Sequence, residues 1–202
     1  KNNRNSMKFL NKYNNIKNIR YKSFEETLKL SYDRGLKTIV ETGTSRGKIK
    51  FFFFKKYNWK DGMSTPIFAE YAKVINGKLH TCDISRENVL NAKKFTKKFS
   101  KYVEYYIQDS LIFLKEFRNP IDLLYLDSLD GHDSILASKH QLNEAKISLD
   151  KLHEKSLILL DDKGSKTNLS INFLIENNYK IIFETEYQVL LSKWFLATKN
   201  CE

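Results

Sequence analysis

The stretch TIVETGTSRG, residues 38–47, joins a short β-branched run to a turn that contains two glycines. A buried strand that ends in an acidic residue and a glycine-rich turn is typical of parallel α/β sheets, which bind nucleotide-type ligands outside the carboxyl ends of their strands. A second run, KLHTC, is followed by Asp83, a carboxylate suited to two ribose hydroxyls. The dinucleotide fingerprint Gly-x-Gly-x-x-Gly is missing after the first run, and Asp83 lies further on than the roughly 20 residues of that motif. The spacing therefore argues against NAD.

Predicted strands and helices alternate along the chain, which requires a mostly parallel sheet with helices on both faces. The runs IDLLYL and SLILL are apolar throughout, as strands buried on both sides are. The last two strands are joined by a short link, which can connect only antiparallel neighbours. We therefore predict an α/β fold with one Rossmann-like doubly wound sheet, mostly parallel with an antiparallel C-terminal strand. The predicted strands are 38–41, 78–82, 103–107, 121–126, 156–160, 180–185 and 188–191, and the main helices are 23–35, 66–75, 85–101, 140–153 and 169–177.

The length of 202 residues suits one domain with a full core. Residues 1–22 are rich in Asn and Lys and are predicted to be a basic, partly disordered arm; residues 23–202 form the domain, with an insert at about 48–61. No apolar run is long enough to span a membrane, and KNNRNS lacks the apolar core of a secretory signal, although the chain does not begin with Met and its true N-terminus could lie upstream. Cys82 and Cys201 are poorly placed for a disulfide, so a reducing, cytoplasmic location is expected.

The net charge of +11 indicates either a nucleic-acid partner or a composition rich in lysine and asparagine. The lysines are spread over the whole chain, which favours composition as the cause. One predicted helix is nevertheless lined by a group of them: Lys93, Lys94, Lys97, Lys98 and Lys101.

Four predicted strands are each followed by an acidic motif, in the order VETGT, CDIS, IQDS and YLDS. In this series the chain resembles the class I S-adenosylmethionine-dependent methyltransferases over residues 24–198. The alternative is that these acids only cap the helices that follow. The resemblance implies S-adenosylmethionine as cofactor. Its methionine part would lie near Glu41, Gly43 and Thr44, its ribose near Asp83 and Ile84, its adenine near Asp109 and Ser110, and its transferred methyl near Asp127.

The insert separates the glycine-containing turn from the helix that should follow it directly. We expect Gly62, Ser64 and Thr65 to complete the cofactor loop after the insert. The insert itself, with four consecutive phenylalanines, Tyr57, Trp59 and several lysines, could be a lid, an acceptor wall or a base-stacking surface. The alternative is that some of these aromatic residues belong to the core.

Asp127 and the pair Asp161–Asp162 follow two strands that should be neighbours, so their carboxylates should converge and repel unless protonated or metallated. The pattern resembles metal-dependent O-methyltransferases and implies Mg²⁺ or another divalent cation on these three residues. That family's common lysine near the first Asp is missing from LDSLDGHD. His132 is the candidate general base. His140 and Glu144 share a helix face that could point at the site, and a surface role is the alternative for each histidine.

The leading hypothesis is an enzyme that methylates an oxygen of a small-molecule or sugar-like acceptor, with Asp127 and His132 as catalytic residues. One alternative is methylation of RNA ribose; methylation of base amino groups is disfavoured because the usual paired prolines are missing after strand 121–126. Another is a non-catalytic binding module that keeps the cofactor fold. A homodimer is compatible with the sequence.

Overall fold

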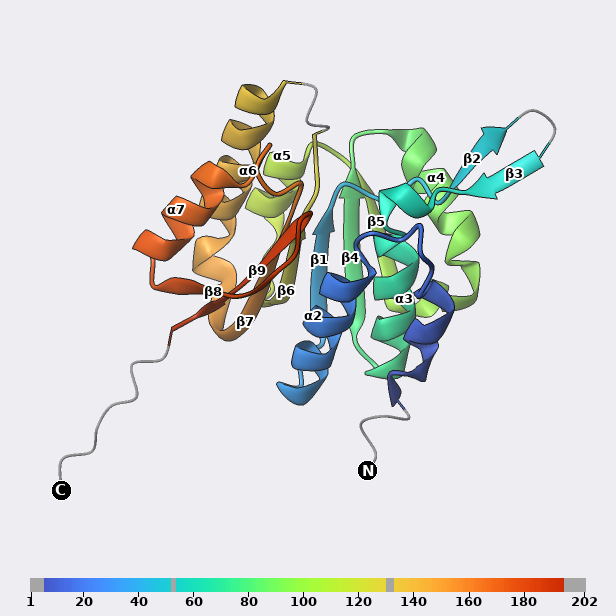
Figure 1. Cartoon of the computed structure of the whole chain (residues 1–202), viewed down its shortest axis with the longest axis horizontal. Coiled ribbons are helices and arrows are strands. Elements are labelled where there is room, and N and C mark those ends of the chain that lie inside the picture. Colours follow the sequence, from blue (N-terminus) through green and yellow to red (C-terminus); the bar gives the residue numbers. More distant parts are fainter. Residues whose placement is uncertain (1–5, 52–53, 130–132, 195–202) are drawn as a thin grey trace.

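A computed structural model describes residues 6–51, 54–129 and 133–194 (Figure 1). Its main sheet has seven strands in the order β5-β4-β1-β6-β7-β9-β8. The strands are β1 (Thr38–Thr42), β4 (Lys78–Asp83), β5 (Val103–Ile107), β6 (Ile121–Leu126), β7 (Leu152–Asp161), β8 (Tyr179–Glu184) and β9 (Gln188–Lys193). The main helices are α2 (Tyr21–Asp33), α3 (Ser64–Val74), α4 (Arg86–Phe95), α5 (Ser110–Glu116), α6 (Ser134–Ser148) and α7 (Asn168–Glu176).

The pairing of the strands confirms the predicted fold class. β1 lies between β4 and β6 and is parallel to both, while β5 and β7 continue the parallel sheet on either side. β9 is antiparallel to β7 and to β8, so it is the reversed strand of the sheet. The chain leaves β1 toward β4 on one side and reaches β6 on the other. The gap between β1 and β6 is therefore the topological switch point, where ligands bind in open α/β sheets.

Alternate residues of the central strands point to opposite faces of the sheet. Ile39 and Leu123 pack with side chains of α2 and α3. Their neighbours Val40 and Leu124 pack with side chains of α5, α6 and α7 on the other face. Figure 1 shows these helices covering the two faces. Because both faces of β1 and β6 are buried, only the ends of these strands reach solvent, and polar chemistry is confined there.

The segment before α2 packs on the body instead of forming the expected arm. Residues 6–22 include the 3₁₀ helix η1 (Lys8–Tyr13), whose Leu10 and Tyr13 are buried in the core shared with α3. The Tyr13 hydroxyl donates hydrogen bonds to the Pro66 carbonyl at 3.2 Å and to Glu70 at 3.0 Å. Two buried residues in a helix of six give too little periodicity to be recognised in the sequence.

The insert is a β-hairpin of β2 (Lys48–Phe51) and β3 (Phe54–Tyr57), followed by the 3₁₀ helix η2 (Trp59–Asp61). The two strands form a separate two-stranded sheet, which extends beyond the body beside α4 (Figure 1). The prediction that this segment is a lid or an acceptor wall stays a prediction.

Helix α6 begins and ends earlier than the sequence indicated. It starts at Ser134 because the Asp133 side chain accepts a hydrogen bond from the Leu136 backbone and caps the helix. It ends at Ser148, and His153 lies in β7 instead of in the helix. Within the described ranges, none of the helices combines the length and the apolar character needed to cross a bilayer.

Candidate functional site

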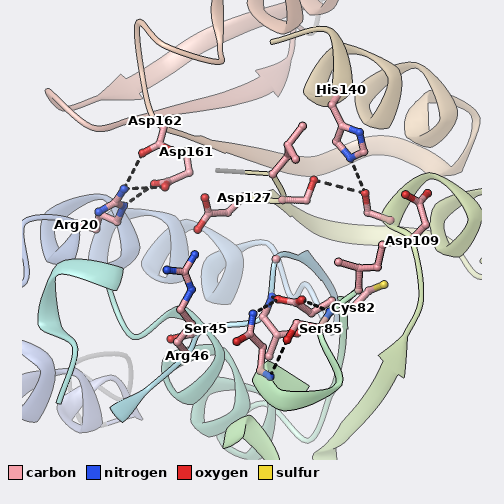
Figure 2. Close-up of a pocket in the computed structure, with 18 of the residues that line it drawn as sticks. Arg20, Ser45, Arg46, Cys82, Ser85, Asp109, Asp127, His140, Asp161 and Asp162 are labelled. Atoms are coloured by element: carbon pink, nitrogen blue, oxygen red, sulfur yellow. Dashed lines mark hydrogen bonds and ion pairs between the residues drawn. The ribbon is translucent and has the colours of Figure 1, made fainter. Parts of the chain in front are cut away.

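A pocket of about 480 Å³ lies at the carboxyl ends of the parallel strands. Its floor contains the ends of β5, β4, β1, β6 and β7, so it spans the switch point between β1 and β6 (Figure 2). This volume is within the usual range for small-molecule and cofactor sites. It is lined by Arg20, Gly43, Thr44, Ser45, Arg46, Lys60, Cys82, Asp83, Ile84, Ser85, Asn88, Asp109, Ser110, Asp127, Ser128, Leu129, His140, Asp161 and Asp162.

The turn after β1 approaches the end of β6 so closely that it requires glycine. Gly43 has a φ of +83°, and a Cβ on it would overlap the backbone carbonyl of Asp127. The Gly43 amide donates to the Cys82 carbonyl at 2.9 Å, and the Asp127 amide donates to the Thr42 carbonyl at 3.0 Å. The three strand ends are therefore joined through their backbones, and the turn stays thin enough to leave room for a ligand.

Asp83 holds this turn from the neighbouring strand. Its carboxylate accepts hydrogen bonds from the Thr44 backbone at 3.1 Å, the Ser85 backbone at 2.7 Å and the Asn88 side chain at 3.1 Å. A carboxylate has about four acceptor positions, so Asp83 can still accept a hydroxyl from the pocket. Asp83 lines the pocket, and its contact with a ribose stays a prediction.

Asp109 and Ser110 line the far end of the pocket, beyond Asp83. The Asp109 carboxylate caps α5 by accepting from two backbone amides, as the capping alternative anticipated. The Ser110 hydroxyl lies 2.8 Å from Nε2 of His140. His140 also lies 3.7 Å from Glu144, and this neighbouring carboxylate raises the pKa of His140. His140 and Glu144 thus share the network that supports this end of the pocket.

Glu41 is placed differently from the expectation, because it is fully buried behind the turn. Its carboxylate accepts hydrogen bonds from Ser64 at 2.5 Å, Thr65 at 2.8 Å and Thr81 at 2.6 Å. Burial raises the pKa of Glu41 to about 7, although these hydroxyl donors oppose the shift. Ser64 and Thr65 begin α3, so Glu41 ties the start of α3 to the ends of β1 and β4.

Four of the predicted cofactor-binding residues therefore lie outside the pocket lining: Glu41, Gly62, Ser64 and Thr65. Thr65 still acts on the turn, since its hydroxyl accepts a 2.8 Å hydrogen bond from the Ser45 backbone. Gly62 lies against Arg20, whose Cδ would be 2.8 Å from a Cβ at that position. The remaining six line the pocket: Gly43, Thr44, Asp83, Ile84, Asp109 and Ser110.

The predicted triplet Asp127, Asp161 and Asp162 converges at the other end of the pocket, with oxygens within 4.8 Å of one another. Two basic residues that the sequence analysis did not identify, Arg20 and Lys166, reach into it. Arg20 donates to Asp161 at 2.6 and 2.8 Å and to Asp162 at 2.8 Å (Figure 2). Lys166 lies 3.2 Å from Asp127 and 2.9 Å from Asp162. The carboxylates are therefore held together by the protein's own cations.

These charges shift the pKa values of the acids in opposite directions. Burial and the nearby Asp161 carboxylate raise the pKa of Asp127 well above its ordinary value. Burial would also raise the pKa of Asp161, but the hydrogen bonds and charge of Arg20 outweigh it and lower that pKa. Burial would lower the pKa of Lys166, yet Asp127 and Asp162 raise it. Asp127 thus has a greater affinity for a proton than Asp161.

Arg20 and Lys166 come from segments without a recognisable motif. Arg20 precedes α2, and Lys166 lies in the loop before α7, four residues after Asp162. Lys166 thus brings an ammonium group to Asp127 from a distant part of the chain, although LDSLDGHD itself contains no lysine. The four-residue spacing in DDKGSK is the one signal that could have indicated it. His132, the predicted general base, lies outside the described residues.

Comparisons with known proteins agree with this fold. Residues 40–163 match the family model described as a methyltransferase domain, whereas no curated protein matches the chain. The fold is similar to the SAH-bound methyltransferase PaMTH1 of Podospora anserina, with a TM-score of 0.60 and 14% identity over 86% of this chain and 78% of that one. It is also similar to an rRNA methylase of Streptococcus thermophilus, with a TM-score of 0.60 and 10% identity over 85% and 96% of the two chains. It is similar, too, to an O-methyltransferase of Bacillus cereus in complex with SAH, with a TM-score of 0.57 and 13% identity over 94% of this chain and 91% of that one.

Proposed function

Since the chain belongs to the methyltransferase-domain family and has the class I S-adenosylmethionine-dependent methyltransferase fold, we propose that it methylates a hydroxyl oxygen of a small-molecule or sugar-like acceptor. The observation that carries the proposal is the pocket itself. It places the Gly43 turn, the Asp83 carboxylate and the Asp127 carboxylate along one cleft at the switch point of the sheet.

The spatial order of the strand ends suggests how S-adenosylmethionine lies in this cleft. Adenine would lie near Ser110 and His140, the ribose hydroxyls on Asp83, and the methionine part along the turn of Gly43 and Thr44. The sulfonium would then point toward the end of β6. This orientation agrees with the strand order β5-β4-β1-β6, which runs from one end of the pocket to the other.

Asp127 is proposed to receive the proton of the acceptor. The methyl group moves from sulfur to the acceptor oxygen by in-line displacement, the carbon–sulfur bond breaks, and the products are S-adenosylhomocysteine and a methyl ether. The hydroxyl proton passes to the Asp127 carboxylate, whose raised pKa makes it a stronger base than an ordinary aspartate. Because the sulfonium already activates the methyl group, alignment and proton removal are the main tasks of the protein.

Calorimetric titration of S-adenosylhomocysteine tests the cofactor site. We expect wild type to bind with micromolar or tighter affinity, and Asp83→Ala to lose this binding because the ribose hydroxyls lose their acceptor and the turn loses its support. Asp150→Ala is the matched control, because Asp150 is exposed and lies just before the start of β7, at the opposite end of the strand from the pocket, and should leave binding unchanged. Wild type that does not bind S-adenosylhomocysteine would contradict the proposed function.

RNA ribose is a second candidate acceptor. The charge of +11 and the similarity to an rRNA methylase support it. Transfer of labelled methyl groups from S-adenosylmethionine to total RNA, compared with transfer to a pool of hydroxylated small molecules, distinguishes the two acceptors. Transfer to RNA should fall steeply as salt rises, because counterions compete for the phosphates.

A further inference from the structure

The acidic triplet differs from an open metal site in one respect: each of its six carboxylate oxygens already has a hydrogen-bond donor. Oδ1 of Asp161 accepts from Arg20 and from Gln188 at 2.7 Å, and its Oδ2 accepts from Arg20. Asp162 accepts from Arg20 on Oδ1 and lies 2.9 Å from Lys166 on Oδ2. The oxygens of Asp127 accept from Lys166 at 3.2 Å and from the Tyr125 hydroxyl at 3.2 Å.

The two cations are held too firmly to be moved aside at little cost. The Lys166 side chain is 1% exposed, and its ammonium also donates to the Leu129 carbonyl at 3.2 Å. The Arg20 side chain is 12% exposed and donates to the Lys60 carbonyl at 2.7 Å. A metal ion entering between the acids would leave these charged groups buried without their partners, which is strongly unfavourable.

The distances also fit an ammonium better than a metal ion. Lys166 lies 2.9 and 3.2 Å from its two carboxylate oxygens, within the range of N–H···O hydrogen bonds. Mg²⁺ binds oxygen at about 2.0–2.1 Å and Ca²⁺ at about 2.3–2.6 Å. The oxygens would have to close in on a common centre and release their donors before they could bind either ion.

We propose that Lys166 and Arg20 take the place of a divalent cation in this triplet, so that methyl transfer in the pocket does not use one. Lys166 is then a positioning residue: it compensates the charge of Asp127 and orients its carboxylate. The sequence resemblance to metal-dependent O-methyltransferases does not extend to the metal.

A triplet without a divalent cation also relaxes what the acceptor must carry, an inference that rests on the proposed function. A divalent cation that binds two adjacent hydroxyls selects acceptors that can chelate it. The Asp127 carboxylate, held by the Lys166 ammonium, accepts one proton and so needs only one acceptor hydroxyl beside it. The acceptor therefore requires only one hydroxyl at the methyl end of the pocket, and a second oxygen next to that hydroxyl is not required.

Electron paramagnetic resonance of Mn²⁺ tests the proposal on the intact protein, because bound Mn²⁺ loses the six-line signal of the free ion. Wild type should leave this signal unchanged. Lys166→Met should gain Mn²⁺ affinity of roughly tenfold or more, about 1.4 kcal/mol, because it frees oxygens of Asp127 and Asp162 around an uncharged side chain. Lys163→Met is the matched control: Lys163 lies in the same loop but pairs with Glu184, so this variant should behave as wild type.

Two results would overturn the proposal. The first is Mn²⁺ binding by wild type that Asp162→Asn abolishes; the second is a folded Lys166→Met that gains no affinity. If Lys166→Met does not fold, Lys166→Gln replaces it, because its amide can still donate a hydrogen bond while the charge is removed. Titration of S-adenosylhomocysteine into the same samples separates the two ideas, since loss of cofactor binding would contradict the proposed function and leave the Mn²⁺ result standing.

Discussion

The guanidinium of Arg20 donates to both carboxylate oxygens of Asp161, 141 residues further along the chain. The pair joins the segment before α2 to the end of β7, and Asp161 is 1% exposed. Such a bidentate pair fixes direction as well as distance. The segment that the sequence indicated to be a loose arm is therefore one wall of the pocket.

Arg20→Met should destabilise the protein by about 3–5 kcal/mol, because it leaves the buried Asp161 carboxylate without its cation. Arg34→Met is the control. Among the residues that the structure describes, Arg34 donates to neutral acceptors, the Ser192 hydroxyl and the Lys155 carbonyl, so this variant should cost about 1 kcal/mol. Urea unfolding of both variants measures the difference. Equal losses would show that the Arg20–Asp161 pair has no special role in stability.

Gly43→Ala should destabilise the folded protein by far more than the positive φ of Gly43 alone explains. Gly43 and Gly164 have nearly the same φ, +83° and +86°, but no atom of the surrounding described residues lies within 4 Å of a Cβ built on Gly164. Gly164→Ala therefore measures the conformational cost, about 1 kcal/mol. Gly43→Ala adds a collision with the Asp127 backbone, and we expect at least about 2 kcal/mol more. Thermal and urea unfolding provide the comparison, and similar losses at the two positions would contradict the close approach.

The buried carboxyl of Glu41 should make the free energy of unfolding depend on pH in a definite direction. Its pKa is about 7 in the folded protein and near the ordinary 4.5 when unfolded, so between these values the folded state holds more protons. The contribution of Glu41 to the free energy of unfolding must then fall as pH rises from about 4.5 to about 7, and it stays constant above that pH. Glu41→Gln removes the effect. The free energy of unfolding of wild type, relative to this variant, should drop by about 3 kcal/mol across that window. Parallel pH curves for the two proteins would show that the carboxyl is not perturbed by burial.

The sequence predicted the strands and the acids at their ends because both depend on local patterns. Apolar runs such as IDLLYL mark buried strands, and parallel strands bring the residues after them to one edge. Asp83, Asp109 and Asp127 could therefore be placed at the pocket without a structure. The individual contacts of these residues could not be predicted. One carboxylate oxygen of Asp109, for example, accepts the two backbone hydrogen bonds that cap α5.

The contacts that close the acidic triplet depend on tertiary packing and have no local signature. Arg20 reaches Asp161 only because η1 and α2 pack on the sheet, and Lys166 reaches Asp127 only because the loop before α7 folds back over β6. Glu41 was predicted at the ligand because it precedes Gly43. It is buried instead because the alternation along β1 points its side chain toward the start of α3. There its carboxylate accepts hydrogen bonds from two hydroxyls of α3 and one of β4.

Gln188, the first residue of β9, has a consequence for biosynthesis. Its side chain amide donates to Asp161 at 2.7 Å and to the Tyr125 hydroxyl at 3.2 Å, and its carbonyl oxygen accepts from Ser23. Residues from the first and the last tenths of the described chain thus meet beneath the pocket. While the ribosome still holds β9 in its exit tunnel, Asp161 lacks one of its supports. A nascent chain should therefore acquire a complete pocket only after β9 has emerged from the ribosome, so that ligand binding cannot precede the release of β9.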